Sequence, residues 1–189
     1  MTDVVDFFCG AGGFSQGLED AGYRVVGAVD VNDDFLDTYR RNSPPHTTVL
    51  NEDLSNIEPS TLKEKIGVSS VPVVVGGPPC KGFSLAGKRD KDDERNDLVF
   101  HFFNHAFEYS PEVIVMENVP GILSMDVLPY VEELCDDNGY DVRYQKLDAS
   151  DYGVPQSRER VVTVAIRRDS SASFSFPKPT VSSPKTVCE

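Results

Sequence analysis

Short apolar runs alternate with amphipathic segments along most of the chain, a pattern typical of parallel β-α-β units. The apolar runs predict seven strands, at residues 4–8, 24–29, 48–50, 71–75, 113–116, 141–147 and 161–166. Between them, a 3.6-residue period predicts helices at 14–21, 33–41, 97–108 and 128–138, with a shorter one within 59–66. The pattern therefore predicts an α/β fold, a doubly wound and mostly parallel seven-stranded sheet.

This pattern stops before the end of the chain. The length of 189 residues fits one domain with its own hydrophobic core. From Ser170 onward, serine, proline and threonine replace the periodic apolar residues, a composition that cannot build a packed core. We therefore predict one domain over residues 1–169 and a Ser/Pro-rich tail over 170–189.

The overall charge argues against a nucleic-acid partner when it is taken alone. There are 31 acidic and 18 basic residues, a formal net charge of -13, and such a surface repels phosphates. However, aspartate outnumbers glutamate, lysine is scarce and tryptophan is absent. This balance resembles that of proteins from the salt-rich cytoplasm of halophilic prokaryotes, where screening weakens long-range repulsion. The basic residues cluster at 81–95, which is the segment most suited to contact phosphates.

Cysteine placement and hydropathy limit the location of the protein. Cys9, Cys80, Cys135 and Cys188 are scattered, so the sequence predicts neither a disulfide framework nor a metal site. No secretory leader is visible, and no apolar run approaches the roughly 18 residues that cross a bilayer. We expect a cytoplasmic protein with no membrane contact.

The first predicted strand leads into a glycine-rich turn and then directly into a helix. Gly10, Gly12 and Gly13 make this turn, which lets backbone amides approach a ligand closely. Their spacing lacks the Gly-x-Gly-x-x-Gly form, so a nicotinamide or flavin cofactor is disfavoured. Asp30 ends the second strand, where a carboxylate can accept both ribose hydroxyls of an adenosine, and Asp53 could accept from an adenine amino group. The alternative is a tight turn with solvated carboxylates.

Two reactive groups follow two other predicted strands. The fourth strand leads into Gly76-Gly77-Pro78-Pro79-Cys80, and the fifth ends in Glu117-Asn118-Val119. Ligands of open α/β sheets bind outside the carboxyl ends of the strands. The Cys80 thiol and the Glu117 carboxyl are therefore expected to face one crevice.

Four motifs, in this order, resemble those of cytosine-5 DNA methyltransferases, which use S-adenosylmethionine. They are Asp6 to Gly13, Gly77 to Cys80 with Phe83-Ser84, Glu117 to Val119, and Gln156 to Arg160. The resemblance covers residues 3–168. It implies a Rossmann-like methyltransferase fold, with a cofactor-binding half over 1–75 and a catalytic half over 76–169.

The resemblance also implies the reaction and a role for each catalytic residue. The Cys80 thiolate adds to carbon 6 of a flipped-out cytosine in duplex DNA, while Glu117 hydrogen-bonds and protonates ring nitrogen 3, so that carbon 5 accepts the methyl group. Glu117 is expected to be buried at its strand end. Arg160 contacts the exocyclic oxygen of cytosine, Arg158 orients Arg160 or a phosphate, and Asn118 fixes the Cys80 loop.

The cofactor would be held by residues that follow the first four strands and begin the fourth helix. These residues are Phe8, Gly10, Gly12, Gly13, Asp30, Val31, Asp53, Leu54, Pro79 and Leu98.

The chain departs from the family pattern in two ways. Lys81 stands where a glutamine usually follows the cysteine, and nothing in 170–189 resembles the target-recognition domain or the closing segment of the family. A second protein chain carrying the recognition domain is therefore an expected partner, as part of a restriction-modification system. Two alternatives remain open. One is an incomplete fragment that retains the fold and cofactor binding, and the other is a tRNA cytosine-5 methyltransferase, which Phe83-Ser84 fits less well.

Overall fold

One seven-stranded sheet organises the computed structural model, which describes residues 1–79, 97–125 and 127–183. The strands are β1 (Asp3–Phe7), β2 (Arg24–Asp30), β3 (Thr48–Asn51), β4 (Val73–Gly76), β5 (Val113–Asn118), β6 (Tyr140–Asp148) and β7 (Glu159–Arg167). The helices are α1 (Gly13–Asp20), α2 (Asp33–Asn42), α3 (Pro59–Ile66), α4 (Asp97–Phe107) and α5 (Val127–Asp137), with short 3-10 turns η2 (Pro120–Ser124) and η3 (Ala149–Tyr152). The predicted α/β fold class is confirmed.

The sheet is parallel in its first five strands and antiparallel at one side. Its order is β3-β2-β1-β4-β5-β7-β6, and β7 pairs antiparallel with both β5 and β6. A short segment containing η3 joins β6 to β7, which suffices for antiparallel neighbours, whereas parallel neighbours need a longer crossover. The five parallel strands consequently place their carboxyl ends at one edge of the sheet.

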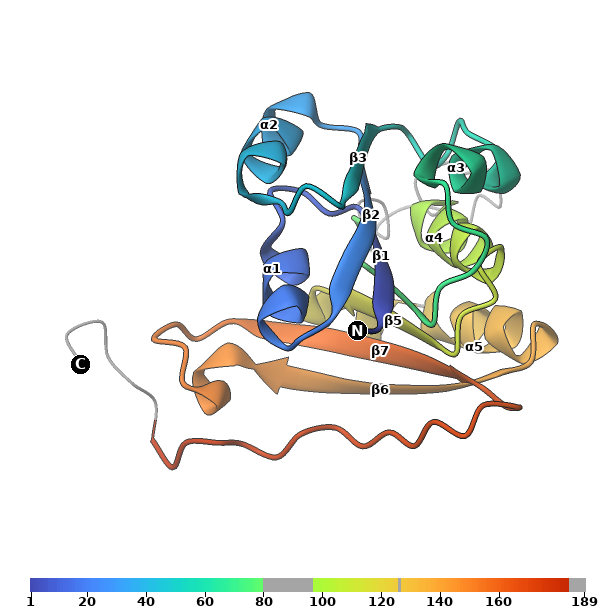
Figure 1. Ribbon diagram of the computed structural model, residues 1–189. Helices are drawn as coiled ribbons and strands as arrows, with labels where there is room; N and C mark the ends of the chain where they lie inside the picture. Colours follow the sequence, from blue (N-terminus) through green and yellow to red (C-terminus); the bar gives the residue numbers. More distant parts are fainter. Residues whose placement is uncertain (80–96, 126, 184–189) are drawn as a thin grey trace.

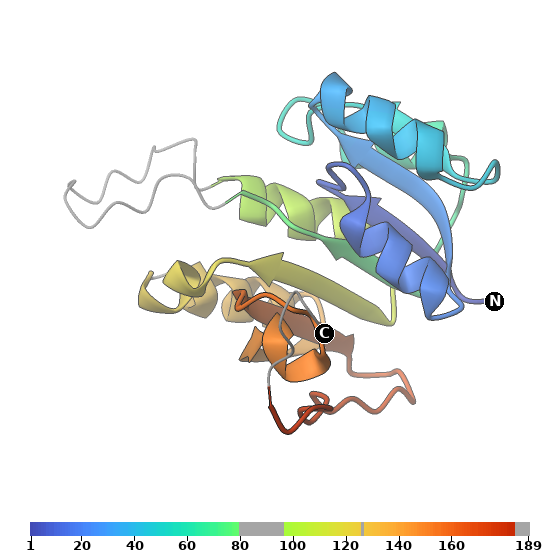
Figure 2. The same cartoon turned by 90° about the vertical axis from the view of Figure 1, so that its left-hand side faces the viewer.

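Helices cover both faces of the sheet (Figures 1 and 2). The larger apolar cluster joins the sheet to α3, α4 and α5 and includes Phe7, Phe102 and Ile114. On the other face, Leu36 and Tyr39 of α2 pack with Ala28 and Cys9. Helices α1 and α2 therefore form one layer, and α3 to α5 the other.

Close packing at the end of β4 requires a glycine. A β-carbon on Gly76 would lie 2.4 Å from the carbonyl oxygen of Phe7 and 2.7 Å from the ring of Phe102. Neither a backbone oxygen nor a fully buried ring can give way easily. Gly76 therefore lets β4 pass close to β1 where the chain turns toward the predicted catalytic loop.

A buried chain of hydrogen bonds connects β1, α1 and α2. The Tyr39 hydroxyl donates to Ser15 Oγ over 2.7 Å, and Ser15 donates to Asp6 Oδ2 over 2.6 Å. Asp6 is 1% exposed, and among the described residues its other oxygen has no hydrogen-bond partner. Burial, supported by the nearby charge of Asp30, raises the pKa of Asp6 to about 7 against the opposing Ser15 bond.

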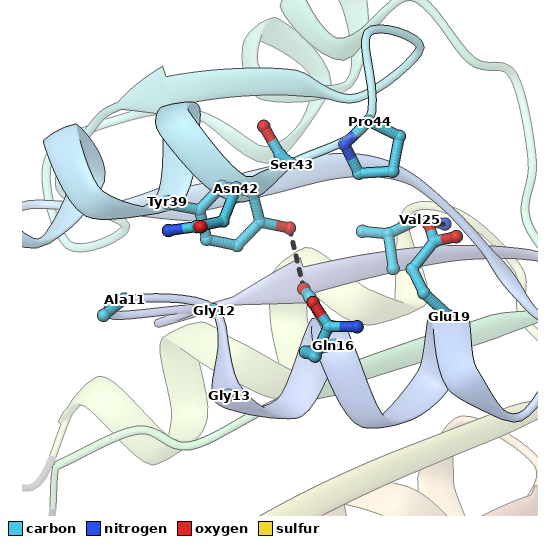
Figure 3. Close-up of a pocket in the computed structure, with 11 residues that line it drawn as sticks. Ala11, Gly12, Gly13, Gln16, Glu19, Val25, Tyr39, Asn42, Ser43 and Pro44 are labelled. Carbon is cyan, nitrogen blue, oxygen red and sulfur yellow. Dashed lines mark hydrogen bonds between the residues drawn. The ribbon is translucent and has the colours of Figure 1, made fainter.

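This chain of bonds lies directly behind the glycine-rich loop. Gly12 has a φ of 98°, and a β-carbon there would lie 2.9 Å from the Tyr39 ring. Figure 3 shows Gly12, Gly13 and Tyr39 around a cavity of about 220 Å³ between α1 and α2. The Tyr39 ring, held by its bond to Ser15, thus limits how far the loop can move toward α2.

The described part of the tail runs beside β6 as extended chain (Figure 1). The carbonyl of Phe174 accepts from Arg143, the carbonyl of Pro177 accepts from the Tyr152 hydroxyl, and Thr180 donates its N–H to Asp151. The described tail therefore attaches mainly through polar contacts at the edge of the sheet.

Two thiols lie in the core of the described structure. Cys9 and Cys135 are both buried and free, and burial raises the pKa of each, to about 12 for Cys135. In the part of the chain that the structure describes, no cluster of three or more histidine, cysteine or acidic side chains could hold a metal ion. The same part contains no helix long and apolar enough to span a membrane.

Replacing Gly76 with alanine should destabilise the fold by about 1–3 kcal/mol, because the added methyl group overpacks the junction of β1, β4 and α4. Gly17→Ala in α1 is a matched control, since nothing lies within 4 Å of a β-carbon there. That control should be neutral or stabilising, because alanine favours a helix more than glycine does. Urea unfolding measures both variants, and equal stabilities would contradict the prediction.

Replacing Asp6 with asparagine should flatten the dependence of stability on pH. The folded-state pKa of about 7 exceeds the ordinary value of 3.8, so the folded chain holds a proton over this interval that the unfolded chain has lost. This contribution to stability is fully present below the unfolded-state pKa and is lost as the pH rises through 7. Between about pH 5.5 and about pH 8, the unfolding free energy of the natural chain should fall by about 2 kcal/mol more than that of Asp6→Asn. Superimposable profiles would show that Asp6 does not titrate in this interval.

Candidate active site

The carboxyl ends of β1 to β4 surround a cavity of about 950 Å³. It is bordered by the loop after β1, the end of β2, the segment after β3, the turn after β4 and the first turn of α4. The sheet topology itself therefore brings these distant segments together. The lining residues are Phe8, Gly10, Asp30, Val31, Asn32, Phe35, Glu52, Asp53, Leu54, Ser55, Asn56, Gly77, Pro79 and Leu98.

Most of the residues expected to hold the cofactor line this cavity. Eight of the ten do so: Phe8, Gly10, Asp30, Val31, Asp53, Leu54, Pro79 and Leu98. Gly12 and Gly13 do not, because the loop turns after Gly10 and places them on the smaller cavity between α1 and α2. Gly12 instead permits the left-handed turn that starts α1.

Asp30 is fixed by backbone N–H groups on both sides of its carboxylate. Gly10 donates to Oδ2 over 2.9 Å, and Asn32 donates to Oδ1 over 2.8 Å. An ionised carboxylate has about four acceptor positions, so capacity remains for further donors. The glycine-rich loop, the end of β2 and the start of α2 are thereby held around one acceptor at the cavity.

Asp53 is fixed in a similar way by its own segment. Its Oδ1 accepts from the hydroxyl of Ser55 over 2.7 Å and from the Ser55 N–H over 2.9 Å, and Oδ2 accepts from Asn56 over 2.8 Å. These bonds, above all that of the Ser55 hydroxyl, lower the pKa of Asp53 below its ordinary value. Asp53 therefore presents a rigid, ionised acceptor to the cavity.

An ion pair joins the end of β5 to the start of β7. Arg160 Nε lies 2.6 Å from Glu117 Oε1, because antiparallel pairing places Glu117 opposite Val162, two residues from Arg160, so the two side chains are diagonal neighbours on one face of the sheet. The expectation that Glu117 is buried is wrong, since its side chain is 35% exposed and its immediate neighbour is a cation. Its other oxygen faces Gly77, where an added β-carbon would lie 3.4 Å away.

Asn118 ties β5 to the turn that follows β4. Its side chain is 4% exposed, and Nδ2 donates to the carbonyl oxygen of Pro78 over 3.0 Å. Its Oδ1 accepts from the N–H of Val119 over 2.9 Å, so the amide is oriented from both ends. Asn118 thus contacts loop backbone, as the sequence analysis expects. Cys80, two residues beyond Pro78, lies outside the described residues.

Asp148 anchors the segment that carries Arg158 and Arg160. Its oxygens accept from the N–H groups of Ser150 and Arg158 and from the Ser157 hydroxyl. These bonds, led by that of Ser150, lower the pKa of Asp148 to about 2. The Arg158 side chain is exposed, and within the described residues Glu159 pairs with Lys146 rather than with it. Arg158 is therefore available for an external anion.

Five cavity residues were not expected from the sequence, namely Asn32, Phe35, Glu52, Ser55 and Asn56, and Gly77 was expected only as part of the motif that leads to Cys80. Ser55 and Asn56 act through Asp53, and Asn32 acts through Asp30. Phe35 could have been found from the sequence, because it is a large apolar residue of α2 that lies outside the buried face formed by Leu36 and Tyr39. The others carry no pattern that distinguishes them from loop residues.

Known proteins share both this sequence and this fold. The model of the family described as C-5 cytosine-specific DNA methylase matches residues 2–188. The type II methyltransferase M.DdeI of Desulfomicrobium norvegicum is 42% identical over 173 residues, which is 88% of this chain and 41% of that protein. A solved structure described as a DNA modification methyltransferase encoded within a prophage (E. coli) superposes with a TM-score of 0.84 at 30% identity, covering 98% of this chain and 53% of that one.

The share of each relative that is matched varies. The chain spans about half or less of the length of most curated relatives that it matches, as with M.DdeI. By contrast, it covers 76% of the type II methyltransferase M.AquIA of Picosynechococcus sp., at 36% identity over 191 residues and 94% of this chain. The chain belongs to the C-5 cytosine-specific DNA methylase family.

Proposed function

We propose that this chain is the cofactor-binding and catalytic part of an enzyme that transfers a methyl group from S-adenosylmethionine to carbon 5 of cytosine in DNA. The observation that carries the proposal is one sheet edge with two kinds of site. A cavity with two fixed carboxylates lies at one end, and an acid–arginine pair beside the Pro78-Pro79 turn lies at the other. Membership of the family gives this arrangement its chemical meaning.

The cavity fits the proposed cofactor in size and in chemistry. A volume of about 950 Å³ is within the ordinary range for ligand sites. Asp30 would accept the ribose hydroxyls and Asp53 the adenine amino group, with Phe8 and Leu54 against the apolar surfaces. S-adenosylmethionine would supply the methyl group as an electrophilic sulfonium. Gly12 and Gly13 would support the loop without lining this cavity.

The other end of the edge suits a flipped-out cytosine. Cys80 follows the turn held by Asn118, and its thiolate would form a bond to carbon 6 of the base. Glu117, in its protonated form, would donate its O–H to ring nitrogen 3. Arg160 would hold Glu117 and contact the exocyclic oxygen. Carbon 5 would take the methyl group, with S-adenosylhomocysteine as the leaving group. Loss of the carbon 5 proton to a base would then allow the bond between carbon 6 and the Cys80 sulfur to break and release Cys80. Exposed Arg158 would meet a backbone phosphate.

Target recognition is proposed to come from a partner chain. The proposal is supported by the lengths of the relatives, because the chain spans 41% of M.DdeI and 53% of the solved prophage methyltransferase. We assign residues 1–75 to cofactor binding and 76–169 to catalysis, although the sheet is continuous across that boundary. The partner would close over the edge where DNA binds. A halophilic, cytoplasmic setting stays a prediction from the acidic composition.

Residues 1–189 alone should show little methyl transfer to duplex DNA, because the proposal assigns the contacts that read base edges to the partner chain. Transfer of labelled methyl groups should rise by at least about tenfold when the product of a neighbouring reading frame that encodes such a domain is added. The same assay with tRNA tests the alternative substrate. Vigorous, site-specific methylation of DNA by the chain alone would overturn the partner proposal, and a preference for tRNA would overturn the DNA proposal.

Cys80→Ala should abolish methyl transfer by the completed enzyme, because the proposed reaction proceeds through the thiolate adduct. It should leave the Kd for S-adenosylmethionine within about twofold, because the described residues that line the cavity are unchanged. Cys188→Ala is the matched control, as this cysteine lies outside every motif, and it should retain both properties. Calorimetry gives the Kd, and labelled methyl transfer gives the rate. Loss of cofactor binding and catalysis together in Cys80→Ala would refute the assigned role.

A further inference from the structure

An exposed aromatic ring lines the cavity without belonging to the core. Phe35 is 52% exposed, although it lies in the first turn of α2 next to buried Leu36. Among the described residues, it is a member of neither apolar cluster. Neighbouring Val31 is 63% exposed and lines the same cavity. Two adjoining apolar side chains thus face a polar-edged cavity instead of the protein interior.

The backbone that carries Phe35 is fixed to the carboxylate at the cavity. The N–H of Phe35 donates to Asn32 Oδ1 over 3.1 Å, which caps α2. The N–H of Asn32 in turn donates to Asp30 Oδ1 over 2.8 Å. Two consecutive hydrogen bonds therefore fix the backbone of Phe35 relative to the carboxylate of Asp30, which lies five residues earlier in the sequence. A ligand that contacts both the ring and the carboxylate would combine hydrogen-bond donors with a flat apolar ring, and a nucleoside offers both in its ribose hydroxyls and its base.

We propose that Phe35 is a specificity-determining residue that packs its ring against the purine of the nucleoside cofactor. This inference rests on the proposed function, because it takes that cofactor to be S-adenosylmethionine. Stacking removes a half-exposed phenyl ring and the face of the purine from water together, which is the source of the stabilisation. Phe35 lies outside the four motifs on which the resemblance to the family rests.

Removal of the ring should weaken the adenosine end of the ligand selectively. Phe35→Ala should raise the Kd for S-adenosylmethionine and for adenosine by a similar factor, roughly 5- to 100-fold. Phe35→Tyr, which keeps an aromatic face, should stay within about threefold of the natural chain. Tyr130→Ala is the matched control, because Tyr130 is 56% exposed on α5 and does not line the cavity. It should leave both Kd values unchanged.

The absence of tryptophan from the chain provides a direct readout of stacking. Phe35→Trp places a single indole at the cavity, and its fluorescence should be quenched on addition of S-adenosylmethionine or adenosine, but not of methionine. Tyr130→Trp should show no change with any of the three probes.

The outcomes separate the two claims. Failure of the natural chain to bind S-adenosylmethionine in calorimetry would overturn the proposed function, and this inference with it. Binding that is intact in the natural chain and unchanged in Phe35→Ala, with no quenching in Phe35→Trp, would overturn the role of Phe35 alone. Equal losses in Phe35→Ala and Phe35→Tyr would also overturn it, since the aromatic face would then be irrelevant.

Discussion

The common edge at which five parallel strands end is the constraint on which the other features depend. Hydrogen bonding in register from β3 to β5 brings Asp30, the segment after β3 and Glu117 to one side of the molecule. None of these groups is near the others in sequence. Close packing at Gly76 and the bond from Asn118 to Pro78 then define where the turn after β4 leaves that edge. The pairing of the strands therefore determines where the side chains of the candidate site lie, and the identity of each side chain determines its chemistry.

The sequence predicts the elements well because their signals are local. Every expected strand and helix occurs, with ends displaced by a few residues, since apolar period and flanking polar residues specify each element separately. The antiparallel placement of β7 between β5 and β6 is a tertiary feature with no such local signal. The short connection through η3 explains why β6 and β7 pair antiparallel. It does not determine which of the two strands pairs with β5, because that depends on the free edge of the sheet.

The candidate site shows the same division. Asp30 and Asp53 were found because each follows an apolar strand, and most expected cofactor residues do line one cavity. Gly12 and Gly13 were misplaced because the direction of the chain after Gly10 depends on Tyr39, which comes from a different helix. The exposure of Glu117 was also missed, because its neighbour Arg160 is distant in sequence and reaches it only through strand pairing. Contacts between separate elements are what a single sequence reveals least.

Asp148 makes the loop before β7 insensitive to moderate changes in pH. It lies outside the cavity, yet its three accepted hydrogen bonds fasten both ends of the loop that leads into β7. With its pKa held at about 2, this fastening persists under conditions acidic enough to protonate ordinary carboxylates. The loop that leads to Arg158 and Arg160 consequently keeps its attachment when cellular acidity shifts, and the side chains that it carries can change in evolution without loosening it.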